Sequence, residues 1–381
     1  MKYVILRVED YAPSDGQTAA LLDGAKTLHL QHLAQAGAVG TIYQKGDLPG
    51  IDRVQLHRAL FGLEPRDPEG SPGRCYAAGA SMELADGETA WCCELITHRD
   101  GAILDPTAGN IPTKESQVLI HALDERLGSD ARRWSVGQGS HHVLVVRDPA
   151  LTSDGGAAIR SPELLIGQAW TRALPGGALG LALRSVIEEG AKLLEDHPIN
   201  RVRADLGENP ANLVWYWGAG QAEPQRTFTA QTGLSSGAVV SDSFLMRGFS
   251  RTLGLTWKAG PASFEEPALQ RLMKTVSTLL DRQDFVYVHL RVQTADPVQR
   301  LCAMERIDHA LLKPLTERLP DLGPWRLMSA IDDPRHSAVP FVAIGSGLPQ
   351  QPASHLTWEQ LAESPLAFEN GAGLFSWFTQ P

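Results

Sequence analysis

The chain has 381 residues, of which 43% are apolar and 20% charged, and its formal net charge at pH 7 is −10. This length excludes one small module and suits two domains, or one large domain with an insertion. No apolar run approaches the roughly 18 consecutive residues of a membrane span. The negative charge argues against broad affinity for nucleic acids or anionic membranes, although a local arginine cluster could still bind a small anion.

The first residues read MKYVILRVEDY, with Glu9 and Asp10 directly after a short apolar run. A secretory signal would have a longer apolar core and a small-residue cleavage site. We therefore expect a buried first strand in a cytoplasmic protein. The four cysteines are too few for a disulfide framework and are expected to be buried thiols.

Short apolar runs alternate with longer amphipathic stretches along most of the chain. Strands are predicted at residues 3–8, 91–98, 141–147, 212–217, 237–241, 284–292, 325–331 and 339–345. Helices are predicted at residues 27–37, 115–128, 182–197, 269–282 and 303–319, where apolar residues recur at three-to-four spacing. Gly37 and Gly128 stand where a helix would need a left-handed C-cap. This alternation predicts an α/β fold with a mainly parallel, covered sheet.

Several phrases of the sequence together resemble the archaeal-type, cofactor-independent phosphoglycerate mutases, a branch of the alkaline phosphatase superfamily. The most specific phrase is DHPINRVRADLGENPANLVWYWGAG, which begins at Asp196. The others are KYVIL at the start, TAGNIPTKE, GSHHVLVVR, SGAVVSDSFLMRG, DFVYVHLRV, AMERID and HSAVPF. The resemblance spans most of the chain.

This resemblance implies an alkaline-phosphatase-like α/β core, with a mainly parallel sheet, formed by residues 1–84 and 206–381. A smaller α/β cap domain is then inserted at residues 85–205. In the family, a loop serine takes the phosphoryl group as a covalent intermediate, and two divalent metals, usually manganese or zinc, activate it. Such chemistry needs the metals, because a serine hydroxyl is a poor nucleophile and two cations stabilise both the attacking and the leaving oxygen.

The loop that matches the family's nucleophile segment departs from the family pattern. Its sequence is LPGIDRVQLHRALFGLEP, in which Ile51 follows Gly50 where the family has serine. No serine or threonine occurs between Thr41 and Ser71. Asp52 is an acyl-phosphate candidate that would itself need a metal. No catalytic residue can be assigned from the sequence.

The expected metal ligands are also reduced in number. The family's Asp-Glu-Ala-Gly-His phrase is replaced by Thr294-Ala295-Asp296-Pro297-Val298, and its Asp-His pair by Asp332-Asp333. Matching positions leave Asp10 (or Glu9), Asp332 and His336. These three could hold at most one divalent metal, manganese or zinc, or could have purely structural roles.

The segments that match the family's substrate-binding residues depart less from the family pattern than the nucleophile and metal-ligand segments do. The positions that match the family's anion-binding residues are Arg74, His142, Arg203, Asn209, Asn212 and Arg247. Arginine suits phosphate or carboxylate because its planar fork donates two parallel hydrogen bonds. Anion binding and a structural ion pair remain open alternatives for Arg74 and Arg247. The phrase NPANLVWYWG could equally be a turn into a core strand.

Three functions follow as expectations. The first is a degenerate family member, without mutase activity, that binds a small phosphorylated or carboxylated metabolite or a protein partner. The second is an active phosphoglycerate mutase or related metal-dependent phosphotransferase with a different nucleophile. The third is a structural subunit of an assembly, such as a homo-oligomer, because the tail GLFSWFTQP would otherwise expose an apolar strip.

Overall fold

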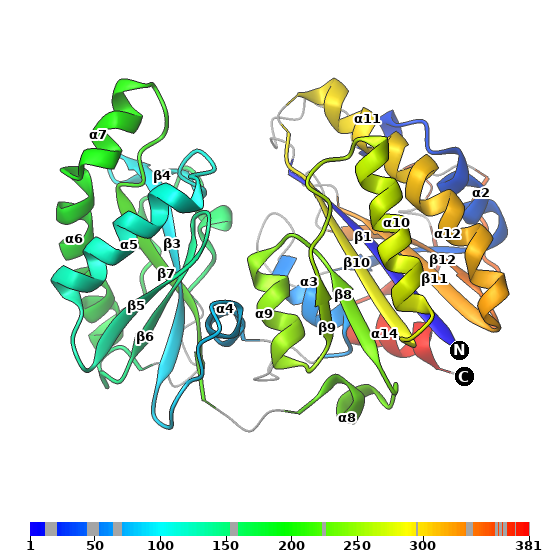
Figure 1. Cartoon of the computed structure of the whole chain (residues 1–381), viewed down its shortest axis with the longest axis horizontal. Helices are drawn as coiled ribbons and strands as arrows, with labels where there is room; N and C mark the ends of the chain where they lie inside the picture. The colour runs from blue at the N-terminus through cyan, green and yellow to red at the C-terminus, as the bar shows by residue number, and fades with distance from the viewer. Residues whose placement is uncertain are drawn as a thin grey trace. The chain divides into compact units, whose positions relative to one another are not determined.

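The protein is described from a computed structural model of the whole chain (Figure 1). The described residues are 1–11, 21–43, 53–63, 71–152, 159–222, 226–294, 296–332, 338–354, 357, 360, 364–369 and 371–380. The chain forms two compact units. The first comprises Met1–Arg66, Arg226–Ser243 and Gly254–Pro381, and the second Asp67–Gln225 and Phe244–Leu253.

The first unit is built on an eight-stranded sheet. Its strands, in spatial order, are β13 (Ala367–Phe368), β2 (Ala38–Tyr43), β12 (Ala338–Gly345), β11 (Trp325–Ile331), β1 (Lys2–Asp10), β10 (Phe285–Val292), β8 (Gly237–Val240) and β9 (Thr256–Lys258). Strands β11, β1, β10, β8 and β9 are parallel, whereas β12 is antiparallel to both of its neighbours. The predicted α/β fold with a mainly parallel sheet is confirmed.

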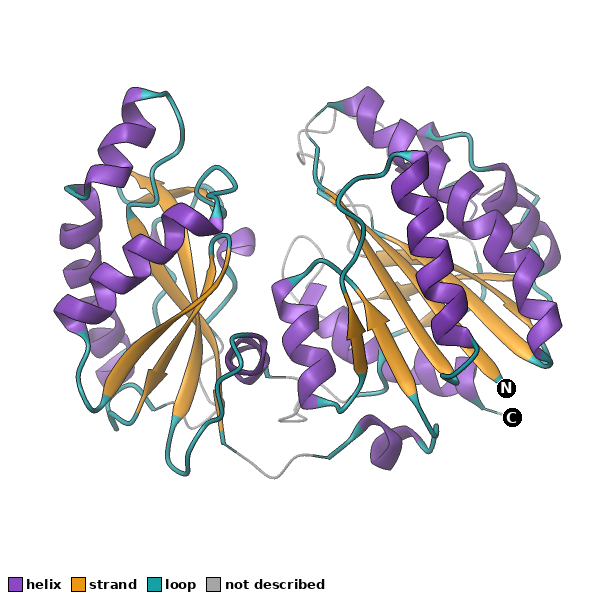
Figure 2. Ribbon diagram, viewed as in Figure 1, coloured by secondary structure: helices purple, strands orange, loops and turns teal. Residues whose placement is uncertain are grey.

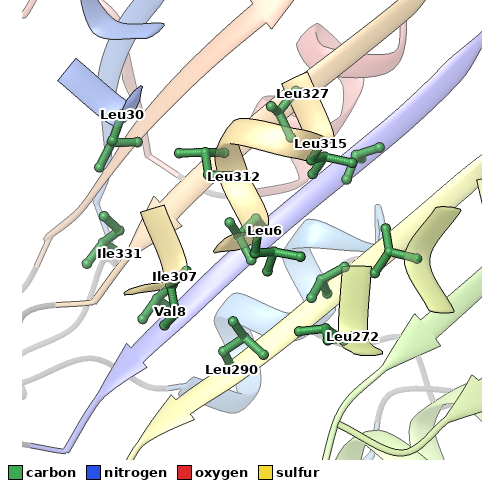
Figure 3. Packing of buried hydrophobic residues seen from close by; sticks show 14 of the residues in the cluster. Leu6, Val8, Leu30, Leu272, Leu290, Ile307, Leu312, Leu315, Leu327 and Ile331 are labelled. Atoms are coloured by element: carbon green, nitrogen blue, oxygen red, sulfur yellow. The ribbon is translucent and has the colours of Figure 1, made fainter. Parts of the chain in front are cut away.

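Helices cover both faces of this sheet (Figure 1). The core on one face is closed by α2 (Leu28–Ala36), α10 (Glu266–Leu280), α11 (Pro297–Ile307), a π-helical turn at Asp308–Leu312 and α12 (Lys313–Arg318). The remaining helices of the unit are α1 (Leu21–Gly24), α3 (Arg53–Leu60), α8 (Phe228–Thr232), a 3₁₀ turn at Leu319–Leu322 and α14 (Gly371–Thr379). The aliphatic core between the sheet and α10, α11 and α12 is shown in Figure 3.

Side chains of β1 alternate between the two faces, and this alternation positions the polar site. Val4, Leu6 and Val8 belong to the aliphatic core under α10, α11 and α12. Arg7 and Glu9 must point to the opposite face, because successive side chains of a strand point in opposite directions. Both are buried all the same, at 0% and 2% exposure.

The C-terminal tail packs on the core of its own unit. On α14, Leu374, Phe375 and Phe378 are buried. The Phe378 ring lies 5.9 Å from that of Tyr3, and the Phe375 ring lies 6.0 Å from that of Phe285. The expectation that this tail exposes an apolar strip is therefore wrong. Its aromatic residues cover the sheet, so the tail gives no support to the hypothesis of a structural subunit.

The second unit contains an antiparallel sheet (Figure 2). Its strands are β3 (Thr89–Arg99), β4 (Ala102–Asp105), β5 (Arg132–Gln138), β6 (His141–Val146) and β7 (Leu213–Gln221). Its helices are α4 (Pro72–Gly79), α5 (Thr113–Leu127), α6 (Gly177–Glu195), α7 (Pro198–Asp205) and α9 (Phe244–Thr252), with 3₁₀ turns at Pro162–Leu165 and Trp170–Arg172. The expected division of the chain at residues 85 and 205 placed α4, β7 and α9 in the core domain, whereas the structure groups them with the second unit.

Two local expectations are wrong. Gly37 ends α2 with φ −111° and Gly128 follows α5 with φ −69°, so neither adopts a left-handed C-cap. Glycine is needed for space instead: a Cβ atom on Gly37 would lie 2.4 Å from the Ala343 carbonyl oxygen, and one on Gly128 would lie 2.2 Å from that of Asp124. Among the described residues, no helix is long and apolar enough to cross a membrane.

Candidate functional site

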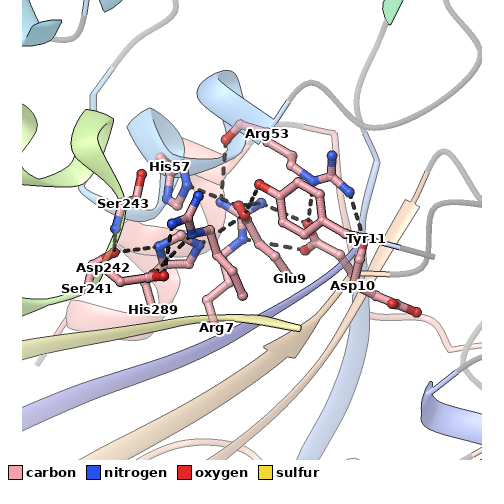
Figure 4. Close-up of polar contacts among 12 residues, drawn as sticks. Arg7, Glu9, Asp10, Tyr11, Arg53, His57, Ser241, Asp242, Ser243 and His289 are labelled. Carbon is pink, nitrogen blue, oxygen red and sulfur yellow. Dashed lines mark hydrogen bonds and ion pairs between the residues drawn. The ribbon is translucent and has the colours of Figure 1, made fainter. Parts of the chain in front are cut away.

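The carboxyl edge of the eight-stranded sheet carries a cluster of buried charged and polar side chains (Figure 4). Glu9 and Asp10 end β1, His289 lies near the end of β10, and Asp332 directly follows β11. In parallel sheets this edge gathers ligands, because the loops that leave the strands diverge there. All four side chains are at least 98% buried.

Glu9 is the centre of the cluster. Its Oε1 lies 2.9 Å from Arg7 Nη2 and 3.1 Å from His57 Nε2. Its Oε2 accepts a hydrogen bond from the Tyr11 hydroxyl at 3.0 Å and lies 3.1 Å from His289 Nε2. Two histidines, a tyrosine and an arginine therefore surround one carboxylate.

Each histidine is held from behind by a hydroxyl group. His57 Nδ1 lies 2.9 Å from the Tyr287 hydroxyl, and His289 Nδ1 lies 2.9 Å from the Ser241 hydroxyl. The two imidazole rings are nearly perpendicular, at 87°, with centroids 4.6 Å apart. A hydroxyl can donate or accept, so both histidines keep Nε2 directed at Glu9 in either tautomer.

Asp332 lies on the same face of the sheet as Glu9 and is paired with arginine. Arg7 Nη2 lies 2.9 Å from Asp332 Oδ2, so this guanidinium bridges the carboxylates of Glu9 and Asp332. Arg53 Nε, from α3, lies 3.7 Å from the same Asp332 oxygen. The Arg53 guanidinium also stacks 4.2 Å from the Tyr11 ring centroid.

Asp10 is directed to the other face of the sheet. Its carboxylate pairs with Arg300 of α11, whose Nε donates to Oδ1 at 3.0 Å and whose Nη2 contacts Oδ2. Both side chains are 1% exposed. Neighbouring residues of a strand point to opposite faces, so Asp10 does not share the face on which Glu9 and Asp332 meet.

The charges of the cluster fix its protonation states. Burial alone would raise the pKa of Glu9, but His289 and Arg7 hold that pKa well below its ordinary value. Burial, with the positive charge of Arg7, lowers the pKa of His57 well below its ordinary value. Burial would also lower the pKa of Arg7, yet Asp332 and Glu9 raise it above its ordinary range. An ionised carboxylate thus faces a neutral His57.

The part of the chain that the structure describes does not fit a two-metal clamp. Two cations would need the carboxylates of Asp10 and Asp332, and each already pairs with a buried guanidinium. A metal at either carboxylate would compete with the guanidinium for the same oxygens, and displacing a buried guanidinium from its carboxylate is costly. Glu9, His57 and His289 form the group of metal-type donors among the described residues, with ligand atoms within 4.8 Å of one another.

The sequence missed most of this cluster. Of the expected metal ligands, His336 lies outside the described residues, and Asp10 and Asp332 are ion-paired. Arg7 and His289 were read only as parts of apolar strands. The available signal was Arg7, a charged residue inside the apolar run YVILRV. It lies two positions before Glu9, on the same face of the strand.

The nucleophile loop cannot be placed, because Gly50, Ile51 and Asp52 lie outside the described residues. The chain is described again from Arg53, the first residue of α3. Within the described part of this segment, Arg53 and His57 on α3 contact the cluster.

Three of the predicted anion-binding residues join loops within the second unit. Arg203 Nη1 lies 2.6 Å from Glu115 Oε2, and Arg203 Nη2 donates to the Ala108 carbonyl at 2.8 Å. Asn209 Nδ2 donates to Asp105 Oδ2 at 2.7 Å. The Asn212 side chain exchanges two hydrogen bonds with the backbone of His98. These contacts give all three residues structural roles, and a ligand-binding role stays a prediction.

The other three also lie in the second unit. His142 Nδ1 accepts from the Gly137 backbone N–H at 3.1 Å, and burial, with His141 nearby, lowers its pKa to about 3. Arg74 is buried on α4. Arg247 lies on α9 with its guanidinium 5.1 Å from the Phe244 ring centroid, and burial, with Arg251 nearby, lowers its pKa. Anion binding by these residues stays a prediction.

A cavity of about 590 Å³ opens where β10 ends and α11 begins, within the first unit. Its walls include Asp242, Phe264, Arg291, Thr294, Gln299 and Arg306. Arg291 donates to both carboxylate oxygens of Asp242, at 3.0 and 2.8 Å. Pockets of this size hold small metabolites, and arginine is the side chain that best recognises their phosphate or carboxylate groups.

Comparison with known proteins agrees with the motifs of the sequence. The family model for 2,3-bisphosphoglycerate-independent phosphoglycerate mutase matches residues 34–200. The mutase of Methanosarcina acetivorans is 28% identical over 331 residues, which cover 83% of this chain and 81% of the relative. That of Methanothrix thermoacetophila is 28% identical over 374 residues, covering 91% and 92% of the two chains.

Solved structures show the same fold. The cofactor-independent phosphoglycerate mutase of Thermoplasma acidophilum superposes with a TM-score of 0.58 at 24% identity, covering 100% of this chain and 99% of the other. A protein of Pyrococcus horikoshii superposes with a TM-score of 0.69 at 18% identity, covering 99% and 96%. The similarity in sequence runs over more than four fifths of the chain, so this chain resembles the 2,3-bisphosphoglycerate-independent phosphoglycerate mutases over most of its length.

Proposed function

We propose that this protein binds a small phosphorylated or carboxylated metabolite of the phosphoglycerate type and does not transfer its phosphoryl group through a serine. The observation that carries the proposal is the pairing of carboxylates with arginines at the carboxyl edge of the sheet. Asp10 pairs with Arg300, and Asp332 with Arg7. Guanidinium groups thus neutralise the carboxylates that two metals would otherwise need.

The sequence supports the same conclusion independently. No serine or threonine hydroxyl occurs between Thr41 and Ser71, a range that includes the segment matching the family's nucleophile loop. A phosphoserine cycle needs that hydroxyl and cations to activate it. This chain lacks the serine hydroxyl in that segment and has guanidinium groups in place of the cations. It is therefore better suited to bind an anion than to transfer a phosphoryl group.

Anion binding is supported by the cavity beside Arg291. The Asp242 side chain that pairs with Arg291 is 40% exposed, so a ligand carboxylate or phosphate can replace it without uncovering a buried charge. The Arg291 side chain itself is only 13% exposed. Such a partly buried fork gains more from an anion than a fully exposed arginine does.

Isothermal titration with 3-phosphoglycerate in metal-free buffer tests binding. We expect saturable binding that Arg291→Met weakens at least tenfold. Arg184→Met, which breaks an exposed ion pair with Glu188 on α6, is the matched control and should bind normally. Arg247→Met tests the position predicted from the sequence: loss of binding there, with Arg291→Met unaffected, would move the anion site to the second unit. Absence of binding at millimolar ligand would refute the proposal.

Phosphoglycerate mutase activity is the second candidate. It is favoured by the similarity to curated mutases over most of the chain. This reaction would require a nucleophile other than serine on the loop around Asp52 and at least one bound metal. Interconversion of 2- and 3-phosphoglycerate by the purified protein distinguishes this candidate from the first.

A further inference from the structure

Glu9, His57 and His289 come from three different elements and meet at one point. Glu9 is on β1, His57 on α3 and His289 on β10. Each side chain is at least 97% buried. The resemblance to the mutase family pointed to Asp10 (or Glu9), Asp332 and His336 as ligands, and assigned no role to either of these histidines. This triad is therefore a feature of this chain's own structure.

The distances within the triad are compatible with a bound cation. His57 Nε2 and His289 Nε2 each lie 3.1 Å from an oxygen of Glu9. In a tetrahedral zinc site with bonds of about 2.0–2.1 Å, neighbouring ligand atoms lie about 3.4 Å apart. Glu9 Oε1 and His289 Nε2 are both buried. Although each lies close to an atom of another triad residue, neither has a hydrogen-bond partner of adequate geometry. A cation between them would satisfy both atoms.

The surroundings orient the triad as metal sites require. Tyr287 and Ser241 hold Nδ1 of His57 and of His289, each at 2.9 Å, so that Nε2 is presented on the inner side. Outer groups of this kind fix the ring orientation of metal-binding histidines. Ser241 is itself fixed, since it accepts a hydrogen bond from the Ser243 backbone N–H at 3.0 Å.

We propose that Glu9, His57 and His289 bind one divalent transition metal, Zn²⁺ or Fe²⁺, through one carboxylate oxygen and two imidazole nitrogens. Two histidines with one carboxylate are the donor set of several zinc enzymes and of non-haem iron sites, whereas Mg²⁺ and Ca²⁺ prefer oxygen ligands throughout. Arg7, 2.9 Å from Glu9 Oε1, also pairs with Asp332, so its positive charge is shared between two carboxylates.

This site is independent of the proposed anion binding. It also differs from a two-metal clamp in using neither Asp10 nor Asp332, both of which stay paired with arginine. A metal on Glu9 would share that carboxylate with Arg7, but Arg7 would keep its pair with Asp332 and would not be left buried without a counter-charge.

The test is titration of the full-length, chelator-treated protein with Zn²⁺, with Co²⁺, and anaerobically with Fe²⁺. We expect one tight equivalent per chain, and for Co²⁺ a visible absorption band of a low-coordinate site. A comparison of the protein's affinity for Zn²⁺ with its affinity for Fe²⁺ distinguishes a zinc site from an iron site. His57→Gln and His289→Gln should each weaken binding at least 100-fold, and Ser241→Ala, which removes only an orienting group, about 10-fold.

The matched control is His141→Gln. His141 also pairs with a buried carboxylate, Glu94, at 2.7 Å, but it lies in the second unit. This variant should keep the full equivalent. X-ray absorption of the metal-loaded wild-type protein should show two imidazole ligands on the metal. This measurement tests the site even if a triad variant does not fold. No tight equivalent, binding unchanged in both histidine variants, or a first shell without imidazole would each overturn the inference.

Discussion

At the scale of single residues, the pairing of Asp10 with Arg300 decides how the carboxyl edge of the sheet is neutralised. Arg300→Met should destabilise the first unit by about 3–5 kcal/mol, because it leaves the Asp10 carboxylate buried without its cation. Arg306→Met, which breaks an exposed pair with Glu265, should cost less than about 1 kcal/mol. Urea unfolding of the two variants checks this, and equal small losses would show that Asp10 is neutralised in another way.

A second residue-scale prediction concerns acid stability. Hydrogen bonds from Arg133, together with a backbone N–H of Ala85, lower the pKa of Glu88 to about 2 from its ordinary 4.5. A carboxylate with a lowered pKa stabilises the folded state above its ordinary pKa and loses that contribution as the pH falls through the folded value. The wild type should therefore exceed Glu88→Gln in melting temperature above pH 5, by a margin that shrinks towards pH 2. Calorimetry across this range checks it; a constant margin would contradict the assignment.

The candidate site was only partly predictable from the sequence for a reason visible at this scale. Glu9 was named as a ligand alternative to Asp10, but which of two adjacent residues faces α3 depends on the register of β1. His57 and His289 are 232 positions apart in the sequence and become neighbours only when α3 packs over β10. Such long-range contacts leave no periodic trace in a single sequence.

At the scale of elements, each of the eight predicted strands has a counterpart: β1, β3, β6, β7, β8, β10, β11 and β12. These strands are buried on both faces, so each appears in the sequence as a nearly continuous apolar run and can be predicted from it. Helices of eight or nine residues have few turns in which a periodic pattern can show: α2 was predicted, whereas α3, α4 and α9 were not. The long helix predicted from residue 303 instead begins at Pro297, capped by Asp296, and contains a π-helical turn.

The contact between α4 and α9 allows an element-scale prediction. A Cβ atom on Gly248 of α9 would lie 1.6 Å from the Cys75 carbonyl oxygen of α4, so Gly248→Ala should separate the helices and destabilise the second unit by about 1–3 kcal/mol. Gly176→Ala, where a Cβ would meet nothing within 4 Å, is the control and should cost only about 0.5 kcal/mol, because alanine is a poorer N-cap residue of α6 than glycine. Equal melting temperatures of both variants would contradict this packing.

At the scale of the whole molecule, the sequence motifs were sufficient to predict the fold and the similarity to the mutases, because the phrases that carry the resemblance span both units. They were not sufficient for function. A family fold can keep its packing while the residues at one sheet edge change, and here guanidinium groups stand beside the carboxylates of Asp10 and Asp332. The electrostatic balance of that edge, more than the overall similarity, is what bears on catalysis.

The central claim is that this protein does not carry out phosphoryl transfer through a serine. Full-length protein incubated with 3-phosphoglycerate and manganese should form no 2-phosphoglycerate above background. Enzymes lower such barriers by roughly 8–23 kcal/mol, and we propose that this protein has neither the serine nucleophile nor the two-metal clamp that would do so. Intact-mass measurement of the same sample should show an unmodified chain. Turnover together with an added phosphoryl mass that maps to residues 47–58 would contradict the claim and name the nucleophile.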